Sequence, residues 1–107
     1  MSIFQLRIYT LKDEQSLRFY KDEVYPRHLR SAAEFNITLH GMWTSPGTDT
    51  RKLYVLVSYP DGSDLDELEQ AYMQSPGFIA DIHDMDPDII RGVESIRLEP
   101  CTASPLR

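Results

Sequence analysis

The sequence predicts an α+β fold in which helices pack on an antiparallel sheet of four strands. Four segments have the alternating or continuous apolar character of strands, and the segments between them carry apolar residues at helical spacing. The chain has 107 residues, of which 41% are hydrophobic and 26% are charged, as in one folded domain of common size. We therefore expect a single domain over residues 1–107 with one modest core.

The first strand is predicted over Phe4–Lys12. Side chains alternate across a strand, which separates an apolar set from a more polar set, namely Phe4, Leu6 and Ile8 from Gln5, Arg7 and Tyr9. We expect the apolar set to pack against the helices, so that Arg7 and Tyr9, together with His40 and Met42, face the other way. There Arg7 could bind a ligand carboxylate or, more simply, pair with an acidic residue such as Glu94.

The first helix is predicted over Asp13–Phe35. Its acidic start suits the positive end of the helix dipole, and an apolar stripe at helical spacing contains Leu17, Tyr20, Val24, His28 and Ala32. Pro26 has no amide hydrogen and its ring clashes with the preceding turn. The pattern therefore predicts a kink or break near Tyr25-Pro26.

Two strands, the second and third in chain order, are predicted over Asn36–Ser45 and Lys52–Tyr59. The second of these is apolar or aromatic on both sides, which predicts that both faces of the sheet are covered. Helices can cover one face, and a second copy of the chain is the simplest cover for the other. We therefore expect a homodimer that forms through the sheet.

The remaining elements complete the order β-α-β-β-α-β. A helix begins at Asp64 with a capping box to Glu67, and a short third helix begins at Ser75-Pro76 with Phe78, Ile79 and Ile82 directed inward. The last strand is predicted over Arg91–Glu99, with Val93, Ile96 and Leu98 buried. This order is the split βαβ plan of ferredoxin-like folds.

Charge and motifs exclude several classes of function. The net charge of −6, without a basic run, disfavours nucleic acids and anionic membranes as partners. No apolar run approaches the length of a membrane span, no signal peptide is visible, and the single cysteine suits a reducing compartment, so we expect a cytoplasmic protein. Phosphate loops, dinucleotide fingerprints, Gly-x-Ser-x-Gly elbows and Cys-x-x-Cys pairs are absent, and we predict no cofactor.

His28 is the candidate catalytic residue, because it lies on the apolar stripe just after the predicted irregularity. An imidazole there could act as a general base on a phenolic or enolisable molecule. The alternative is a structural histidine that is hydrogen-bonded to a carbonyl left free by Pro26. Tyr25, Trp43 and Tyr72 could line a pocket for a flat apolar or aromatic ligand, or could simply be large core residues.

The segment 81–88 holds four aspartates and one histidine, which raises the question of a metal site. It lacks the glycine and glutamate of an EF-hand and the histidine spacing of a zinc site. We expect a solvated acidic loop at the end of a helix and no metal.

Several short motifs are spread over nearly the whole chain, namely Leu6–Lys12, Tyr25-Pro26, Gly41 with Trp43, Ser75-Pro76 and Ser104–Arg107. Together they resemble the NIPSNAP family, a branch of the dimeric α+β barrel superfamily. The resemblance implies a homodimer whose two sheets face each other and close a barrel. The superfamily includes cofactor-free monooxygenases, isomerases and haem-degrading enzymes, so the reaction stays open. Three hypotheses follow: a small-molecule-binding protein or cofactor-free enzyme of monooxygenase or isomerase type, a non-enzymatic dimerisation or interaction module, and a haem-binding protein with His28 or His83 as ligand.

Overall fold

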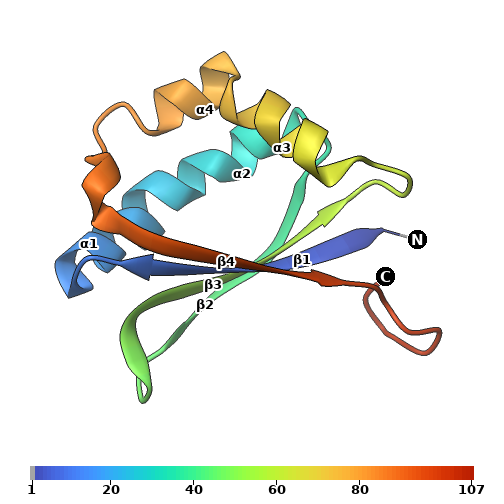
Figure 1. The fold of residues 1–107 in the computed structure, drawn as a ribbon, viewed down its shortest axis with the longest axis horizontal. Coiled ribbons are helices and arrows are strands. Elements are labelled where there is room, and N and C mark those ends of the chain that lie inside the picture. Colours follow the sequence, from blue (N-terminus) through green and yellow to red (C-terminus); the bar gives the residue numbers. More distant parts are fainter. Residues whose placement is uncertain (1) are drawn as a thin grey trace.

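The structure, a computed structural model that describes residues 2–107, has one antiparallel sheet with helices on one face (Figure 1). In chain order the elements are β1 (Ile3–Leu11), α1 (Glu14–Phe19), a π-helical segment (Tyr20–Val24), α2 (Tyr25–Ala33), β2 (Thr38–Ser45), β3 (Asp49–Tyr59), α3 (Leu65–Met73), α4 (Pro76–Asp81), a 3-10 turn (Pro87–Ile89) and β4 (Ile90–Leu98). The strands lie in the order β2-β3-β1-β4, and each neighbouring pair is antiparallel. The predicted α+β class and element order are confirmed.

The predicted irregularity in the first helix takes the form of a π-helical segment. Asp13 caps α1 by accepting a 2.7 Å hydrogen bond from the amide of Ser16. Five residues separate the Tyr25 amide from the Tyr20 carbonyl that it binds, so the turn before Pro26 is wider than an α-turn. Pro26 then occupies the first turn of α2, where a missing amide hydrogen costs little.

The two faces of β1 are the reverse of those predicted. Alternation does separate Phe4, Leu6 and Ile8 from the other side chains, but it is the set with Arg7, Tyr9 and Leu11 that meets the helices. Leu11 is fully buried, and Tyr9 packs on two tyrosines of the helical layer. The guanidinium of Arg7 and the hydroxyl of Tyr9 form hydrogen bonds inside the fold, so these polar groups can be buried between the sheet and the helices.

The β2 strand has a bulge beside His40. Its register against β3 shifts between Leu39 and Gly41, so Met42 shares the face of Arg7 as predicted, whereas His40 lies on the opposite face. Met42 packs on the helix-side core, whereas His40 contacts the Phe4 ring and lies 2.7 Å from the Ser58 hydroxyl oxygen on the other face.

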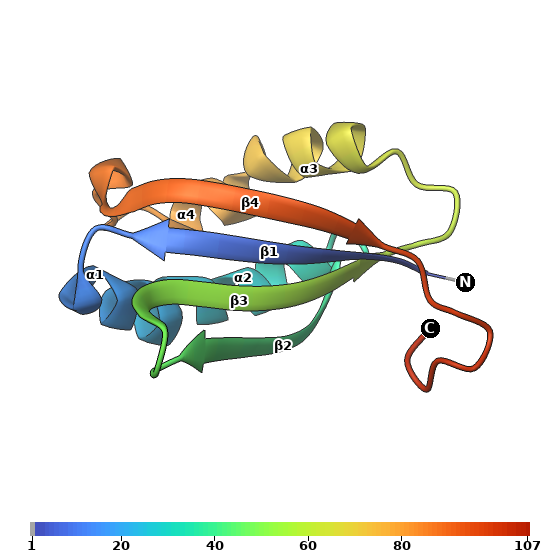
Figure 2. The same cartoon turned by 60° about the horizontal axis from the view of Figure 1, so that its bottom comes forward.

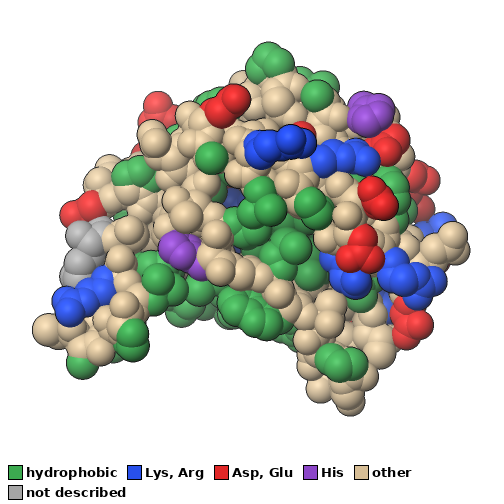
Figure 3. Space-filling model, turned by 180° about the vertical axis from the view of Figure 1, so that it is seen from behind, with side chains coloured by type: hydrophobic (Ala, Val, Ile, Leu, Met, Phe, Trp, Pro, Cys, Tyr) green, Lys and Arg blue, Asp and Glu red, His purple; other side chains and the backbone are tan. Residues whose placement is uncertain are grey.

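No helix of residues 2–107 covers the second face of the sheet, which we call the open face (Figure 2). Trp43, Ile96 and Leu98 lie on it with exposures of 54%, 46% and 41%. The Trp43 ring lies directly over Gly41, where any Cβ would overlap it. Seen from behind, the lower outline of the molecule, on the side of the open face, is hollowed (Figure 3).

Burial was overestimated at several positions. Val93, Ile96 and Leu98 were predicted to be buried, yet all are exposed in the single chain because β4 is an edge strand. In α4, Phe78 and Ile82 pack on the core as predicted, but Ile79 is 56% exposed. A helix of six residues presents only one narrow face to the core.

Candidate functional site

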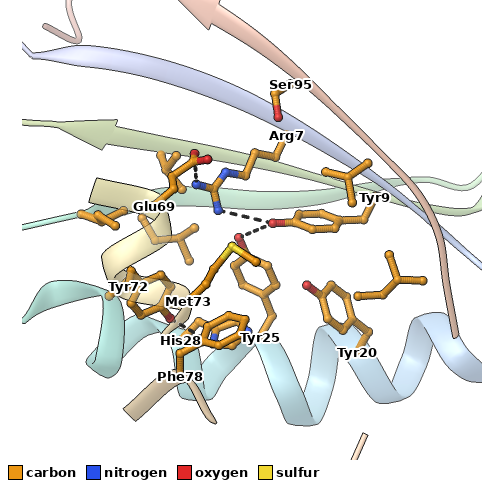
Figure 4. A pocket seen from close by; sticks show the side chains of 16 residues that line it. Arg7, Tyr9, Tyr20, Tyr25, His28, Glu69, Tyr72, Met73, Phe78 and Ser95 are labelled. Atoms are coloured by element: carbon orange, nitrogen blue, oxygen red, sulfur yellow. Dashed lines mark hydrogen bonds and ion pairs between the residues drawn. The ribbon is translucent and has the colours of Figure 1, made fainter. Parts of the chain in front are cut away.

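A cavity of about 340 Å³ lies between the inner face of the sheet and the helical layer (Figure 4). Apolar side chains form most of its wall, including Ile37, Leu39, Val57, Met73 and Phe78. The polar groups gather in two places: around His28 on the helical side and around Arg7 on the sheet. A mostly apolar cavity of this size with a few fixed polar groups is typical of a small-molecule site.

On the helical side, His28 of α2 is paired with Asp81 at the end of α4. The His28 Nδ1 atom lies 2.9 Å from the Asp81 Oδ2 atom, and the two side chains are 8% and 13% exposed. Asp81 was predicted to lie in a solvated loop, and for this residue the prediction was wrong, because its side chain is nearly buried against His28. The partner of His28 is this carboxylate and not a carbonyl freed by Pro26.

The same carboxylate ends a short chain of hydroxyl groups. Ser31 donates a 2.5 Å hydrogen bond to Asp81, and the Ser31 and Tyr72 hydroxyl oxygens are 2.7 Å apart. Tyr72 also approaches His28 Nδ1 at 3.1 Å. Since Asp81 can only accept when ionised, Nδ1–H and Ser31 both donate to it, and Tyr72 donates to Ser31.

Arg27 holds Asp81 in place from the outer side. Its Nη1 atom donates to the Asp81 backbone carbonyl at 2.7 Å, and its two Nη atoms bind both carboxylate oxygens of Asp84 at 2.7 and 3.1 Å. This fork joins α2 to the end of α4, on the helix that begins at the Ser75 cap. The His28–Asp81 contact is thus fixed from both elements.

Burial sets the protonation state of this cluster. It lowers the pKa of His28, because the apolar surroundings disfavour the imidazolium more than Asp81 favours it. At neutral pH the contact is therefore a hydrogen bond from a neutral imidazole. Burial likewise raises the pKa of Tyr72 to about 12, so its hydroxyl stays protonated and available as a donor.

The second ring nitrogen of His28, Nε2, has no hydrogen-bond partner within residues 2–107. The hydrogen bonds of the His28 ring within residues 2–107 all use Nδ1. In the same residues, every side-chain nitrogen or oxygen that is fully buried has a hydrogen-bond partner. Nε2 must therefore retain accessible surface, and His28 lines the cavity. Phe78 stacks on the ring with centroids 5.0 Å apart and planes 5° apart, and Tyr25 meets it edge-on at 5.2 Å. A neutral imidazole with Nδ1–H bound and Nε2 free has the form of a general base.

On the sheet side, Arg7 is the centre of a second polar cluster. Its Nε atom donates to Gln5 at 2.8 Å, and its Nη2 atom donates to Glu69 at 2.6 Å and to the Tyr59 hydroxyl. Its Nη1 atom has only a long contact, 3.5 Å, to the Tyr9 hydroxyl. The predicted pairing of Arg7 with an acidic residue is confirmed, but the partner is Glu69 and not Glu94. Glu94 stands opposite Ile8, on the open face.

Three tyrosines connect the two clusters. The Tyr9 and Tyr25 hydroxyl oxygens are 3.2 Å apart, and the Tyr20 ring packs on both rings at 5.3 and 5.5 Å. Burial, first of all, raises the pKa values of Tyr20 and Tyr25 well above the usual value for tyrosine. These phenols are therefore neutral donors at physiological pH.

The structure brings together three of the four predicted ligand-binding residues with His28. Arg7, Tyr25 and Tyr72 line the cavity, whereas Trp43 lies on the open face, because its strand position is opposite Tyr54 of β3. The sequence analysis missed Asp81 and Glu69 as members of the site. Glu69 lies on the helix capped by Asp64. The apolar residues Leu65 and Tyr72, one helical turn before and after it, place it near the apolar stripe, and this spacing could have identified it.

The part of the chain that the structure describes offers no support for a metal site or for a ligand site at His83. No group of three or more histidine, cysteine, aspartate or glutamate side chains in residues 2–107 is placed to hold a metal ion. His83 binds the Ala80 carbonyl at the surface and stands outside the cavity. None of the helices described here is both long enough and apolar enough to cross a bilayer.

Comparison with known proteins gives a family and a fold. The NIPSNAP family model matches residues 4–105. A NIPSNAP family protein of unknown function from Agrobacterium tumefaciens superposes with a TM-score of 0.78 at 20% identity, covering 99% of this chain and 94% of that one. A NIPSNAP domain protein from Burkholderia xenovorans gives 0.72 at 21%, covering 96% and 98%. A candidate antibiotic biosynthesis monooxygenase from Nitrosomonas europaea gives 0.65 at 10%, covering 95% and 93%. No curated protein matches the sequence.

Proposed function

Because the chain belongs to the NIPSNAP family, whose fold leaves the reaction open, we propose from its cavity that it binds a small flat molecule and removes a proton from it with His28. The reaction needs no cofactor in this proposal. It is the first step of an oxygenation or an isomerisation of a phenolic or enolisable substrate. One observation carries the proposal: His28 lines an apolar cavity, and its Nδ1–H is held by Asp81, which leaves Nε2 as the nitrogen that can accept a proton.

The chemistry of the dyad supports this role. A carboxylate that accepts from Nδ1–H fixes the tautomer that leaves Nε2 as the base, and it stabilises the imidazolium that forms. The lowered pKa of His28 keeps the base unprotonated at neutral pH. The aromatic walls, Tyr25 and Phe78, provide flat surfaces against which an aromatic ring can stack. Structural neighbours that include a candidate monooxygenase are consistent with such chemistry.

Ionisation of 4-nitrophenol tests the proposal, because its anion absorbs visible light and its neutral form does not. We expect the purified protein to increase the ionised fraction of the phenol at pH 6.5, as the proton moves to Nε2. His28→Gln should still bind the phenol, as observed by ligand NMR, without increasing its ionised fraction. His83→Gln is the matched control, since His83 is at the surface. Equal ionisation by the wild type and His28→Gln would contradict the role of His28 as base.

The two alternatives give other results in the same experiments. An interaction module would bind no phenol, and His28→Gln would change only its stability. A haem protein would show a Soret band on reconstitution that His28→Gln removes. An interaction module gives Nε2 no role, whereas a haem ligand would use this same atom with Nδ1–H held by a carboxylate, so the Soret measurement distinguishes the haem alternative from the base.

We also propose that two copies of the chain associate through the open face. That face lacks a helical cover within the described chain, and it exposes Trp43, Ile96 and Leu98. Apolar groups of this size are stabilised when they are removed from water. Sedimentation velocity at micromolar concentration tests the proposal, and a monomer would contradict it.

A further inference from the structure

The cluster around Arg7 offers hydrogen-bond donors to the cavity that the protein itself does not use. A guanidinium has five N–H donors, and here Nε and Nη2 serve Gln5, Glu69 and Tyr59. The two N–H groups of Nη1 have only the 3.5 Å contact to Tyr9 in the described structure, which is long for a hydrogen bond. Arg7 lines the cavity, so Nη1 is the part of the guanidinium that a ligand can bind.

The tyrosines add a further donor beside it. A hydrogen bond joins the Tyr9 and Tyr25 hydroxyls. That bond uses one of the two hydroxyl hydrogens, so the other O–H remains free to donate. Both residues line the cavity. An acceptor oxygen placed at this end would therefore meet both a guanidinium N–H and a phenol O–H.

The charge at this end favours one kind of acceptor. Glu69 lies 2.6 Å from Arg7 and already neutralises most of its positive charge. A ligand carboxylate or phosphate, with its full localised charge, would compete with Glu69 for the same guanidinium. A carbonyl oxygen has no such conflict, and it can acquire partial negative charge during a reaction, when the donors stabilise it most.

Tyr25 spans the distance between the His28 end of the cavity and the Arg7 end. Its hydroxyl belongs to the Arg7 end, through the 3.2 Å contact with Tyr9, while its ring meets the His28 ring at 5.2 Å (Figure 4). The distance between base and donors is therefore about that of one aromatic ring with its substituents. A molecule of the same length, stacked in the cavity, would have one polar group at each end.

We propose that the ligand is a hydroxyaryl carbonyl compound in which the hydroxyl and the carbonyl are para to each other, with the hydroxyl at His28 and the carbonyl oxygen at Arg7 and Tyr25. The inference rests on the proposed role of His28 as base. The O–H bond of the ligand breaks and its proton moves to Nε2. The electron pair left on the oxygen delocalises through the ring to the carbonyl oxygen. The products are a conjugated anion and an imidazolium that faces Asp81.

This class also suits the strength of the base. A carbonyl para to a phenol makes that phenol a stronger acid, because the carbonyl shares the charge of the anion. The neutral His28 that burial favours is a weak base, and it can share a proton with such a phenol more readily than with an unsubstituted one.

Isomers of hydroxybenzaldehyde test the inference. In the 4-isomer the hydroxyl and the carbonyl are conjugated and stand at opposite ends of the ring, as proposed. The 3-isomer has the same two groups, but they are not conjugated with each other and their oxygen atoms are closer together. At pH 7 we expect the protein to bind the 4-isomer about tenfold more tightly, and to bind it partly as the anion seen by absorbance. Tyr25→Phe removes only a hydroxyl, and it should reduce this preference about three- to tenfold. Tyr54→Phe, on β3 away from the cavity, is the control and should leave the preference unchanged.

The outcomes separate the two proposals. If 4-nitrophenol is ionised through His28 but the two aldehydes bind equally, the base is real and the proposed substrate class is wrong. Equal loss of affinity for both isomers in Tyr25→Phe would also overturn the inference, because it would mean that Tyr25 contributes only packing. If neither aldehyde binds and 4-nitrophenol is not ionised, the proposed function itself fails.

Discussion

Replacing Asp81 by asparagine tests the central contact of the site. The Asp81 carboxylate accepts from His28 at 2.9 Å and from Ser31 at 2.5 Å, and its side chain is only 13% exposed. Hydrogen bonds to a charged group contribute about 1.5–3 kcal/mol each. Asparagine keeps one acceptor oxygen but loses the charge and presents an NH₂ group to donors. We therefore expect Asp81→Asn to reduce the free energy of unfolding by about 2–3 kcal/mol.

The pKa of His28 should change in a defined direction. The hydrogen bond and the charge of Asp81 both raise this pKa against the larger effect of burial. Without them burial acts alone, so Asp81→Asn should lower the pKa of His28 further. Urea denaturation measures the stability, and an NMR titration of the His28 ring proton measures the pKa.

Asp84→Asn is the matched control for this change. Asp84 is three residues away and pairs with Arg27 at the surface, with 40% exposure. We expect this variant to leave the pKa of His28 nearly unchanged. A His28 pKa that is unaffected or raised in Asp81→Asn would refute the geometry of the pair.

Three further predictions concern the core, pH and assembly. Leu11→Ala removes a fully buried side chain and should reduce the free energy of unfolding by about 2–5 kcal/mol in urea, whereas Leu29→Ala, at a residue that is 46% exposed, should cost much less. The folded-state pKa of His28 lies below its ordinary value of 6.5, so the unfolded chain takes up this proton first as the pH falls. Stability should therefore decrease below about pH 6.5, and His28→Gln should make the decrease shallower in urea titrations at successive pH values; an identical slope would show that another group is responsible. Trp43→Lys should shift the protein to a monomer in sedimentation velocity while its far-UV circular dichroism stays the same, and Leu29→Lys should leave the assembly intact.

The element order was predictable because each strand and helix carries its own periodic pattern. The orientation of β1 was not, because alternation shows which side chains share a face and is silent on which face meets the helices. Here the more polar set is inside. The presence of Arg7 among buried residues depends on Glu69, which is 62 residues away. The local sequence around Arg7 contains no trace of this partner.

The site itself was predictable only in part. His28 and Tyr72 were found because a stripe of apolar spacing contains them. Asp81 was missed because it stands among other aspartates, and nothing in the sequence distinguishes it from the exposed Asp84. It is 53 residues from His28 in the sequence, and only the fold brings the two side chains to 2.9 Å. Trp43 was misplaced because an aromatic residue in a strand can suit either face of a sheet.

The π-helical segment has a consequence for how the chain can vary in length. A wide turn holds one residue more than an α-helical path over the same rise, so Tyr20–Val24 can be regarded as an α-helix that has gained a residue. Removing one residue there would restore a regular helix and would turn α1 by about 100° relative to α2. Tyr20 would then leave the cavity while His28 kept its place. Relatives that differ by one residue in this segment should therefore share the base and differ in the aromatic wall that the ligand meets.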